Sequence, residues 1–196
     1  MRDKIEAWKE HVREVSGRPE FVHHEWFVRW HLEIVERIAL ELCNKYPQAD
    51  RDLVEVMVWL HDYGKILDFD NQYAVTLSSG KAKLTEMGFT QGLVERAVKG
   101  IEILDRKDFE ELANSAIEIQ IVSSADGCSH LVGPFFNLWW YENPGKPWQE
   151  LMANNRAKHE KDWYRKITLP EARAAFAARH NFLLEQTGEL PEKFLN

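Results

Sequence analysis

Val56–Lys65 read VMVWLHDYGK, a short apolar run that passes directly into a histidine–aspartate pair. The apolar residues recur at the spacing of one helical face, which predicts an amphipathic helix here. Asp50 or Asp52 can cap the start of this helix, and Gly64 is expected to close it in a left-handed conformation. The buried stripe of the helix is predicted to comprise Leu53, Val56, Met57, Leu60 and, at its end, His61.

Apolar residues recur at helical spacing along nearly the whole chain, and sustained alternation of apolar and polar residues is almost absent. The sequence therefore predicts an all-α fold. Two segments interrupt the pattern. Asp68–Gly80 is polar and is expected to be a loop, whereas Gly133–Trp148 crowds aromatic residues between prolines and glycines, as a folded loop or lid would. The other predicted helices are Lys4–Val15, Phe21–Tyr46, Lys81–Met87, Leu93–Leu104 and a helix from Phe109 to near Gly127. The apolar stripe of Phe21–Tyr46 comprises Phe27, Trp30, Ile34, Ile38 and Leu42. A last helix is predicted to be capped by Thr168 and Glu171 and to end at Gly188.

The chain has 196 residues, two cysteines and a formal net charge of −7, which together bound its class. This length suits one globular domain over residues 1–196 with a hydrophobic core of its own. The negative balance disfavours nucleic acid as a partner. Two isolated cysteines indicate a reducing compartment. A charged N-terminus and the lack of a long apolar run predict no signal peptide, no membrane span and a cytoplasmic location.

Four titratable residues fall on or beside the predicted buried stripes. His31 shares a face with apolar residues of the second predicted helix, His61 and Asp62 end the third, and Asp126 follows buried positions of a later one. A titratable group on a buried face costs free energy unless something pairs with it. Two imidazoles and two carboxylates on three helices therefore predict a site for one divalent cation.

The order His31, then His61–Asp62, then Asp126 resembles the H…HD…D signature of the HD superfamily of metal-dependent phosphohydrolases. VMVWLHDYGK carries the HD-x-G-K form of the motif, and SSADGCSHL from Ser123 carries the last aspartate. The similarity covers roughly Val22–Leu131, with a weaker likeness in the last predicted helix. Four ligands in this order on helices are a far more specific signal than an isolated histidine–aspartate pair.

The resemblance implies a single HD-type helical bundle, with a metal-binding core over about residues 22–131 and C-terminal helices over residues 146–188 packed on it. It implies one divalent ion (manganese, magnesium, cobalt, nickel or iron) held by His31, His61, Asp62 and Asp126, a mixed nitrogen and oxygen set that leaves positions open for water and substrate.

The activity implied by the resemblance is hydrolysis of a phosphoester or phosphoanhydride in a small phosphorylated metabolite, with a nucleotide expected by analogy alone. Metal-bound hydroxide would attack phosphorus. The predicted catalytic residues are Asp62, Lys65 and Asp126: Asp126 ligates the ion and orients the water, and Lys65 stabilises the developing charge.

The chain departs from three subgroups of this superfamily. No histidine lies between Asp62 and Asp126, where members with two metals need further ligands, so one metal is favoured. Lys65 and Ile66 stand in place of the acidic pair of alarmone hydrolases, and only Asp68 lies near the position of the catalytic glutamate of 5′-nucleotidases. Two alternatives stay open: a catalytically weak metal- or ligand-binding HD module or helical interaction protein, and an HD-type oxygenase with two irons.

Residues outside the signature leave further roles open. Basic residues between Arg156 and Lys166 could form a second phosphate clamp or a solvated helix face. Lys65, His24, Asp68 or a water could be the general acid, although His24 lies two helical turns from His31 in the predicted helix. The aromatic residues that could stack a nucleobase, form a homodimer surface or pack in the core are Phe135, Phe136, Trp139, Trp140, Tyr141 and Trp148. The histidines whose spacing recommends no site role are His11, His130, His159 and His180.

Overall fold

The computed structural model describes residues 1–195, and in this range the chain forms helices, three of them short π-helical turns, without any strand. The predicted all-α fold is therefore confirmed. The elements are α1 (Arg2–Ser16), η1 (Val28–Leu32), α2 (Glu33–Lys45), α3 (Arg51–Leu60), α4 (Tyr63–Leu67), α5 (Gln72–Val75), η2 (Thr76–Gly80), α6 (Lys81–Glu86), α7 (Gln91–Arg106), α8 (Phe109–Ala113), α9 (Ile117–Ser129), α10 (Phe135–Glu142), α11 (Trp148–Lys161), η3 (Asp162–Lys166) and α12 (Pro170–Gln186).

Helix α3 is the centre of the core, because α1, α2, α7 and α9 all pack against it. Every residue from Leu53 to Leu60 is buried, so the helix hides all its faces rather than one stripe. Even Glu55 is fully buried, and it is paired with Lys9 at 2.5 Å and with Arg2 at 2.7 Å from α1. Asp50 caps the helix by accepting a hydrogen bond from the backbone N–H of Leu53.

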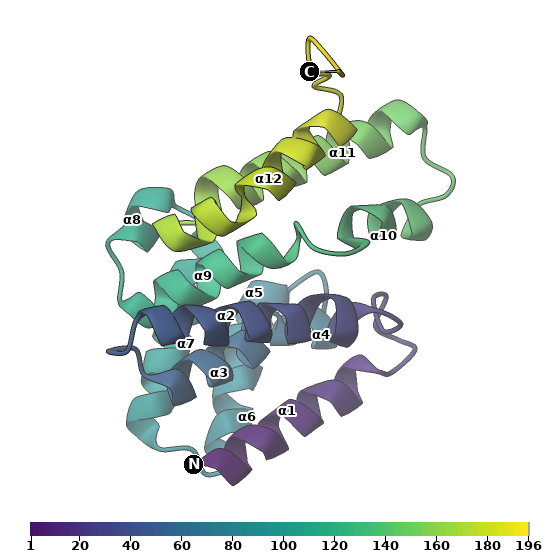
Figure 1. Cartoon of the computed structure of the whole chain (residues 1–196). Coiled ribbons are helices and arrows are strands. Elements are labelled where there is room, and N and C mark those ends of the chain that lie inside the picture. The colour runs from purple at the N-terminus through teal and green to yellow at the C-terminus, as the bar shows by residue number, and fades with distance from the viewer. Residues whose placement is uncertain (196) are drawn as a thin grey trace.

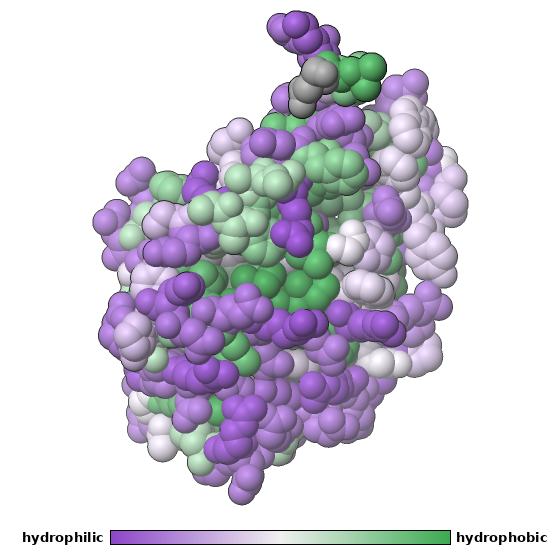
Figure 2. Space-filling view, in the orientation of Figure 1, coloured by the Kyte–Doolittle hydropathy of each residue, from purple (hydrophilic) through white to green (hydrophobic). Residues whose placement is uncertain are grey.

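Helices α2 and α9 lie side by side across the middle of the molecule (Figure 1), and η3 and α12 pack on α9 from the other side. The termini lie at opposite ends of this stack (Figure 1). Figure 2 shows hydrophobic side chains in the band between α2 and α12, where α9 runs. Because α9 is covered from both sides, the titratable side chains that it carries are held inside the molecule.

The second predicted helix begins later than its apolar pattern suggests. Residues 22–26 form successive turns, and the continuous helical segment starts at Phe27, directly before η1. The start at Phe21 is thus wrong, because side chains in this segment bond across the molecule instead: His23 and Trp26 both contact Glu142 of α10 at 2.7 Å. The fully buried positions of η1 and α2 are Leu32, Val35 and Ala39, whereas Trp30, Ile34 and Ile38 of the predicted stripe are only partly buried.

The sequence predicted that Gly64 ends the helix with a left-handed backbone, and this prediction is wrong. This glycine lies inside α4 and does not have a positive φ. A Cβ atom there would lie 2.0 Å from the carbonyl oxygen of Gln72 and 2.4 Å from the backbone nitrogen of Thr76, so only glycine admits the close approach. The segment that approaches, predicted as a loop over Asp68–Gly80, is helical in α5 and η2.

Two further boundaries differ from the predictions. The helix expected from Phe109 to Gly127 is broken at residues 114–116 into α8 and α9. The expected cap at Thr168 is absent, because α12 has Leu169 at its N-cap with no side-chain bond. Instead, Ser124 of α9 accepts hydrogen bonds from the backbone N–H groups of Thr168 and Leu169 at 3.1 and 3.2 Å. Gly188 follows the last helix with φ of +108°, as a terminating glycine should.

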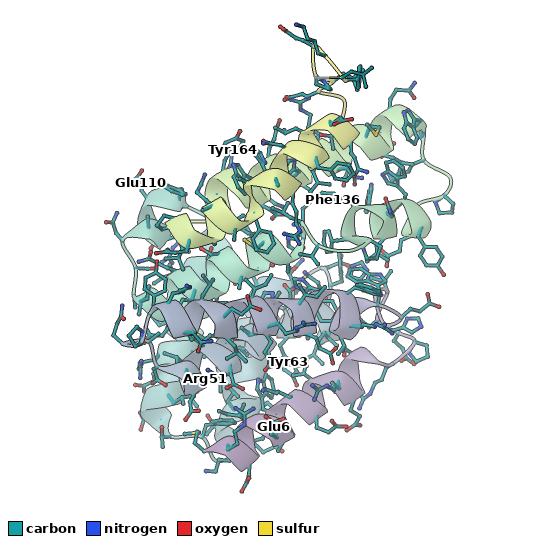
Figure 3. The ribbon with its side chains drawn as sticks, viewed as in Figure 1. Glu6, Arg51, Tyr63, Glu110, Phe136 and Tyr164 are labelled. Atoms are coloured by element: carbon teal, nitrogen blue, oxygen red, sulfur yellow. The ribbon has the colours of Figure 1, made fainter. Side chains whose placement is uncertain are left out.

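The aromatic segment is not the loop that its prolines and glycines suggested, because Phe135–Glu142 forms α10. Phe136, which is labelled in Figure 3, is buried. Its ring contacts that of His159 of α11 edge to face, with centroids 6.1 Å apart. Within residues 1–195, every helix is too short or too polar to span a lipid bilayer.

Candidate metal centre

Three elements bring the four predicted ligand residues together. His31 belongs to η1, His61 and Asp62 follow the last turn of α3, and Asp126 belongs to α9. The Nε2 atoms of His31 and His61 are 3.2 Å apart. Oδ2 of Asp62 lies 3.3 Å from His31 Nε2 and 3.7 Å from His61 Nε2. Oδ1 of Asp126 lies 3.8 and 3.9 Å from the same two nitrogens.

The hydrogen bonds behind both imidazoles determine which ring nitrogen faces the centre as an acceptor. Nδ1 of His61 lies 2.7 Å from the carbonyl oxygen of Val58, and a carbonyl only accepts. Nδ1 of His31 lies 3.2 Å from Oγ of Ser129, whose own hydroxyl proton is donated to the carbonyl of Asp126. Each Nδ1 therefore donates its proton outward, and in the neutral rings both Nε2 lone pairs point to the centre.

Two nitrogen lone pairs and two carboxylate oxygens thus face one another without a proton between the nitrogens. Such a cluster of acceptors is unfavourable by itself, whereas a cation among them converts each repulsion into an attraction. Ligand atoms bound at roughly 2.1 Å to one ion lie about 3 Å or more apart, which matches the spacings found here. The residues therefore fit a divalent ion, and the first group of three potential ligands is His31, His61 and Asp62.

Each carboxylate of the centre is also held by a lysine. Lys65 Nζ lies 2.5 Å from Asp62 Oδ2, and Lys166 Nζ lies 2.5 Å from Asp126 Oδ2. Burial alone raises the pKa of both aspartates, but the neighbouring lysines and histidines outweigh it and hold each pKa well below its usual range. Burial also lowers the pKa of His31, although the nearby Asp62 and Asp126 act to raise it. At neutral pH the centre therefore presents ionised carboxylates and a neutral His31.

His130 also lies in this centre, although its spacing recommended no role. Its ring is stacked on His31 with centroids 5.0 Å apart, and its Nε2 is 3.5 Å from Oδ1 of Asp126. With His31 and Asp126 it forms the second group of three that could hold a metal ion. His130 follows Asp126 by four residues and so shares its helical face, and this spacing was the signal that could have found it.

A buried ionic network lies behind His130. Asp162 is fully buried and contacts His130 Nδ1 at 2.9 Å and Lys166 Nζ at 3.4 Å, and it is also paired with Lys158. Burial lowers the pKa of His130 to about 3 and that of Lys158 to about 7, in spite of the nearby acid. Burial opposes the ionisation of Asp162, but His130, Lys158 and Lys166 lower its pKa below the usual range. Asp162 therefore anchors the wall of the centre through charge.

The centre opens into a cavity of about 360 Å³. Its wall combines positive charge with aromatic surface, which suits an anionic ligand that also carries a flat or apolar part. The lysines in the wall are Lys65, Lys107, Lys158, Lys161 and Lys166, and the aromatic residues are Trp26, Phe27, Phe69, Tyr73, Phe135, Phe136 and Trp139.

The remaining predicted residues divide between cavity and surface. Lys158, Lys161 and Lys166 of the basic run line the cavity, whereas Arg156 pairs with Glu160 and Glu189 outside it. Among candidate general acids, Lys65 lines the cavity, but His24 and Asp68 do not. His24 bonds the carbonyl of Phe21, and Asp68 accepts hydrogen bonds from Asn71.

The residues of the aromatic segment lie partly in the cavity wall and partly away from it. Phe135, Phe136 and Trp139 line the cavity, and Phe135 lies against His130 with ring centroids 4.1 Å apart. Trp140 packs edge to face on Trp148 away from it, with centroids 4.8 Å apart, and the Tyr141 side chain is exposed.

A family model described as HD domain matches residues 29–187 of the chain. This range contains all four residues that surround the centre and extends through α12. No curated protein and no solved structure matches the chain.

Proposed function

The chain belongs to the HD domain family, whose members are in general metal-dependent phosphohydrolases, and from this premise we propose that it hydrolyses a phosphoester or phosphoanhydride of a small phosphorylated metabolite. The observation that carries the proposal is the set of four acceptor atoms around one point, in the wall of a cavity rich in lysine. The centre and the cavity wall together could then activate a water nucleophile, stabilise the charge that develops and bind the phosphate group.

His31, His61, Asp62 and Asp126 would hold a divalent ion, which would lower the pKa of a water molecule and neutralise charge on phosphoryl oxygens. The side chains do the rest. Ser129 and the carbonyl of Val58 keep the two imidazoles in the tautomer that offers Nε2 inward. Asp126, fixed by Lys166 through Oδ2, presents Oδ1 to orient the attacking water. Lys65 presents its ammonium group beside Asp62, where it stabilises negative charge that develops on the phosphoryl group.

We assign a nucleotide as the favoured substrate. Trp26, Phe69 and Trp139 line the same cavity and offer flat apolar surface for a base. The flat surface makes the proposal specific: a nucleotide should be hydrolysed better than a phosphorylated sugar of the same charge.

The test combines elemental analysis with phosphate release from a panel of phosphorylated metabolites, with and without added manganese. We expect about one ion per chain and manganese-dependent release. Asp62→Ala should retain less than a tenth of the metal and lower kcat by at least 100-fold, because a ligand is lost. Asp68→Ala is the matched control, since this carboxylate lies outside the cavity wall and should be without effect.

Two outcomes would contradict the proposal. Metal bound at the expected ratio without release from any compound indicates a binding module without turnover, because many HD domains are inactive. Two irons per chain with bound colour indicates the oxygenase alternative.

A further inference from the structure

The five lysines of the cavity wall are not equivalent in their partners. Lys65 is paired with Asp62, Lys166 with Asp126, and Lys158 with Asp162. Lys107 and Lys161 form no ion pair with any carboxylate among residues 1–195, although both line the cavity. A cation without a counter-ion in a cavity wall is available to a ligand, whereas the other three already neutralise acids of the protein.

Lys161 ends α11 and is partly buried at the cavity. Burial lowers the pKa of its ammonium group, and the positive charges of Lys166 and Lys107 lower it further. Both lysines line the same cavity, Lys107 directly after the end of α7 and Lys161 at the end of α11. Two repelling cations on one wall are stabilised together by a bound anion.

Lys107 has a strained backbone at the end of α7. Its φ of 51° and ψ of 36° place it in the left-handed region, and it is the only residue among 1–195 other than glycine with positive φ. Glycine normally takes this position after a helix, and the chain uses glycine at its other positive φ angles. The lysine at this position therefore places a charged side chain where glycine would leave none. Its Nζ is held 2.8 Å from the hydroxyl of Tyr73, over the ring at 4.8 Å from the centroid.

The acids on this side of the cavity do not cancel the two charges. Asp105 lines the wall and forms no ion pair, one of its oxygens lacks any hydrogen-bond partner in the described chain, and burial raises its pKa to about 6. Glu142 is engaged by His23 and Trp26. Two lysines thus face one unpaired acid, so the net unpaired charge of this part of the wall is positive.

We propose that Lys107 and Lys161, with the hydroxyl of Tyr73, form a second phosphate subsite in the cavity. The substrate would then carry a second phosphate besides the phosphoryl group cleaved at the metal centre. This inference rests on the proposed function for the reaction, but the subsite itself can be tested without turnover.

The first experiment measures binding of inorganic phosphate to metal-free protein by calorimetry in the presence of a chelator. Wild type should bind phosphate, and Lys161→Ala and Lys107→Ala should each weaken binding by at least tenfold. Lys107→Gly removes the same charge while relieving the strained φ, so it should also lose phosphate binding although its fold is not impaired. Lys99→Ala, an exposed lysine paired with Glu102, is the control and should bind as wild type does. Absence of phosphate binding, or equal affinity in all variants, would overturn the proposal.

The second experiment compares phosphate release from a nucleoside 5′-monophosphate and the matching 3′,5′-bisphosphate. Wild type should prefer the bisphosphate by at least tenfold in kcat/KM, and Lys161→Ala should lose the preference through a higher KM for the bisphosphate. Turnover of both compounds without preference would refute the second subsite. Lysine-dependent phosphate binding without turnover of any compound would support the subsite and contradict the proposed hydrolase function.

Discussion

Ser129 illustrates how a residue that is not itself a ligand controls the centre. It is fully buried on α9, accepts a hydrogen bond from His31 Nδ1 and donates its own to the carbonyl of Asp126. These two hydrogen bonds fix both the tautomer and the orientation of His31. Ser129→Ala leaves Nδ1 without a partner in a buried place, and we expect metal affinity to fall by roughly 10- to 100-fold. Calorimetric titration with manganese measures this, and Ser78→Ala on the surface is the control. Affinity within twofold of wild type would contradict the role given to Ser129.

At the scale of elements, α4 is held against α5 and η2 by the absence of a side chain at Gly64. The backbone N–H of Gly64 donates to Oγ1 of Thr76 at 2.8 Å, and Thr76 donates to the carbonyl of Gln72. This packing carries Lys65 next to Asp62. Gly64→Ala would push a methyl group into backbone atoms 2.0 and 2.4 Å away, and we expect it to destabilise the fold by about 3 kcal/mol.

Urea denaturation of matched variants tests this element-scale prediction. Gly92 lies in α7, and a methyl group added there would have no other atom within 4 Å, so Gly92→Ala should stabilise the fold by about 0.5–1 kcal/mol. Equal effects of the two substitutions would show that helix propensity, rather than the contact between α4 and η2, governs both positions.

For the whole molecule, the metal centre joins η1, the end of α3 and α9 through side chains that repel one another without a cation. Binding of an ion should therefore stabilise the entire fold. Manganese at 100 times its dissociation constant should contribute about 2.7 kcal/mol and raise Tm by about 5–10 °C. Thermal unfolding with manganese and with chelator measures the shift. Asp62→Ala should show almost none of it, and an equal shift in this variant would place the stabilising ion elsewhere.

The helical class of the fold was predictable because apolar periodicity is a property of neighbouring residues in one chain segment. The order of His31, His61, Asp62 and Asp126 also predicted which side chains should meet, and the structure brings these four together. Segment boundaries were less predictable where tertiary contacts replaced local ones. Thr168 looked like a helix cap, but Ser124 from α9 accepts hydrogen bonds from the backbone N–H groups at this end of the helix.

The sequence alone predicted an all-α chain, because helical periodicity is a property of single segments, and the order of His31, His61, Asp62 and Asp126 predicted the residues that converge on one centre through its resemblance to the HD signature. Only the tertiary structure decided what surrounds that centre. His130 stacks on His31, Asp162 supports His130 from η3, and Lys107 and Lys161 line one cavity from different parts of the chain. Apart from the spacing of His130 to Asp126, these neighbours are distant in the sequence, and their contacts depend on how whole helices pack, which no local pattern encodes.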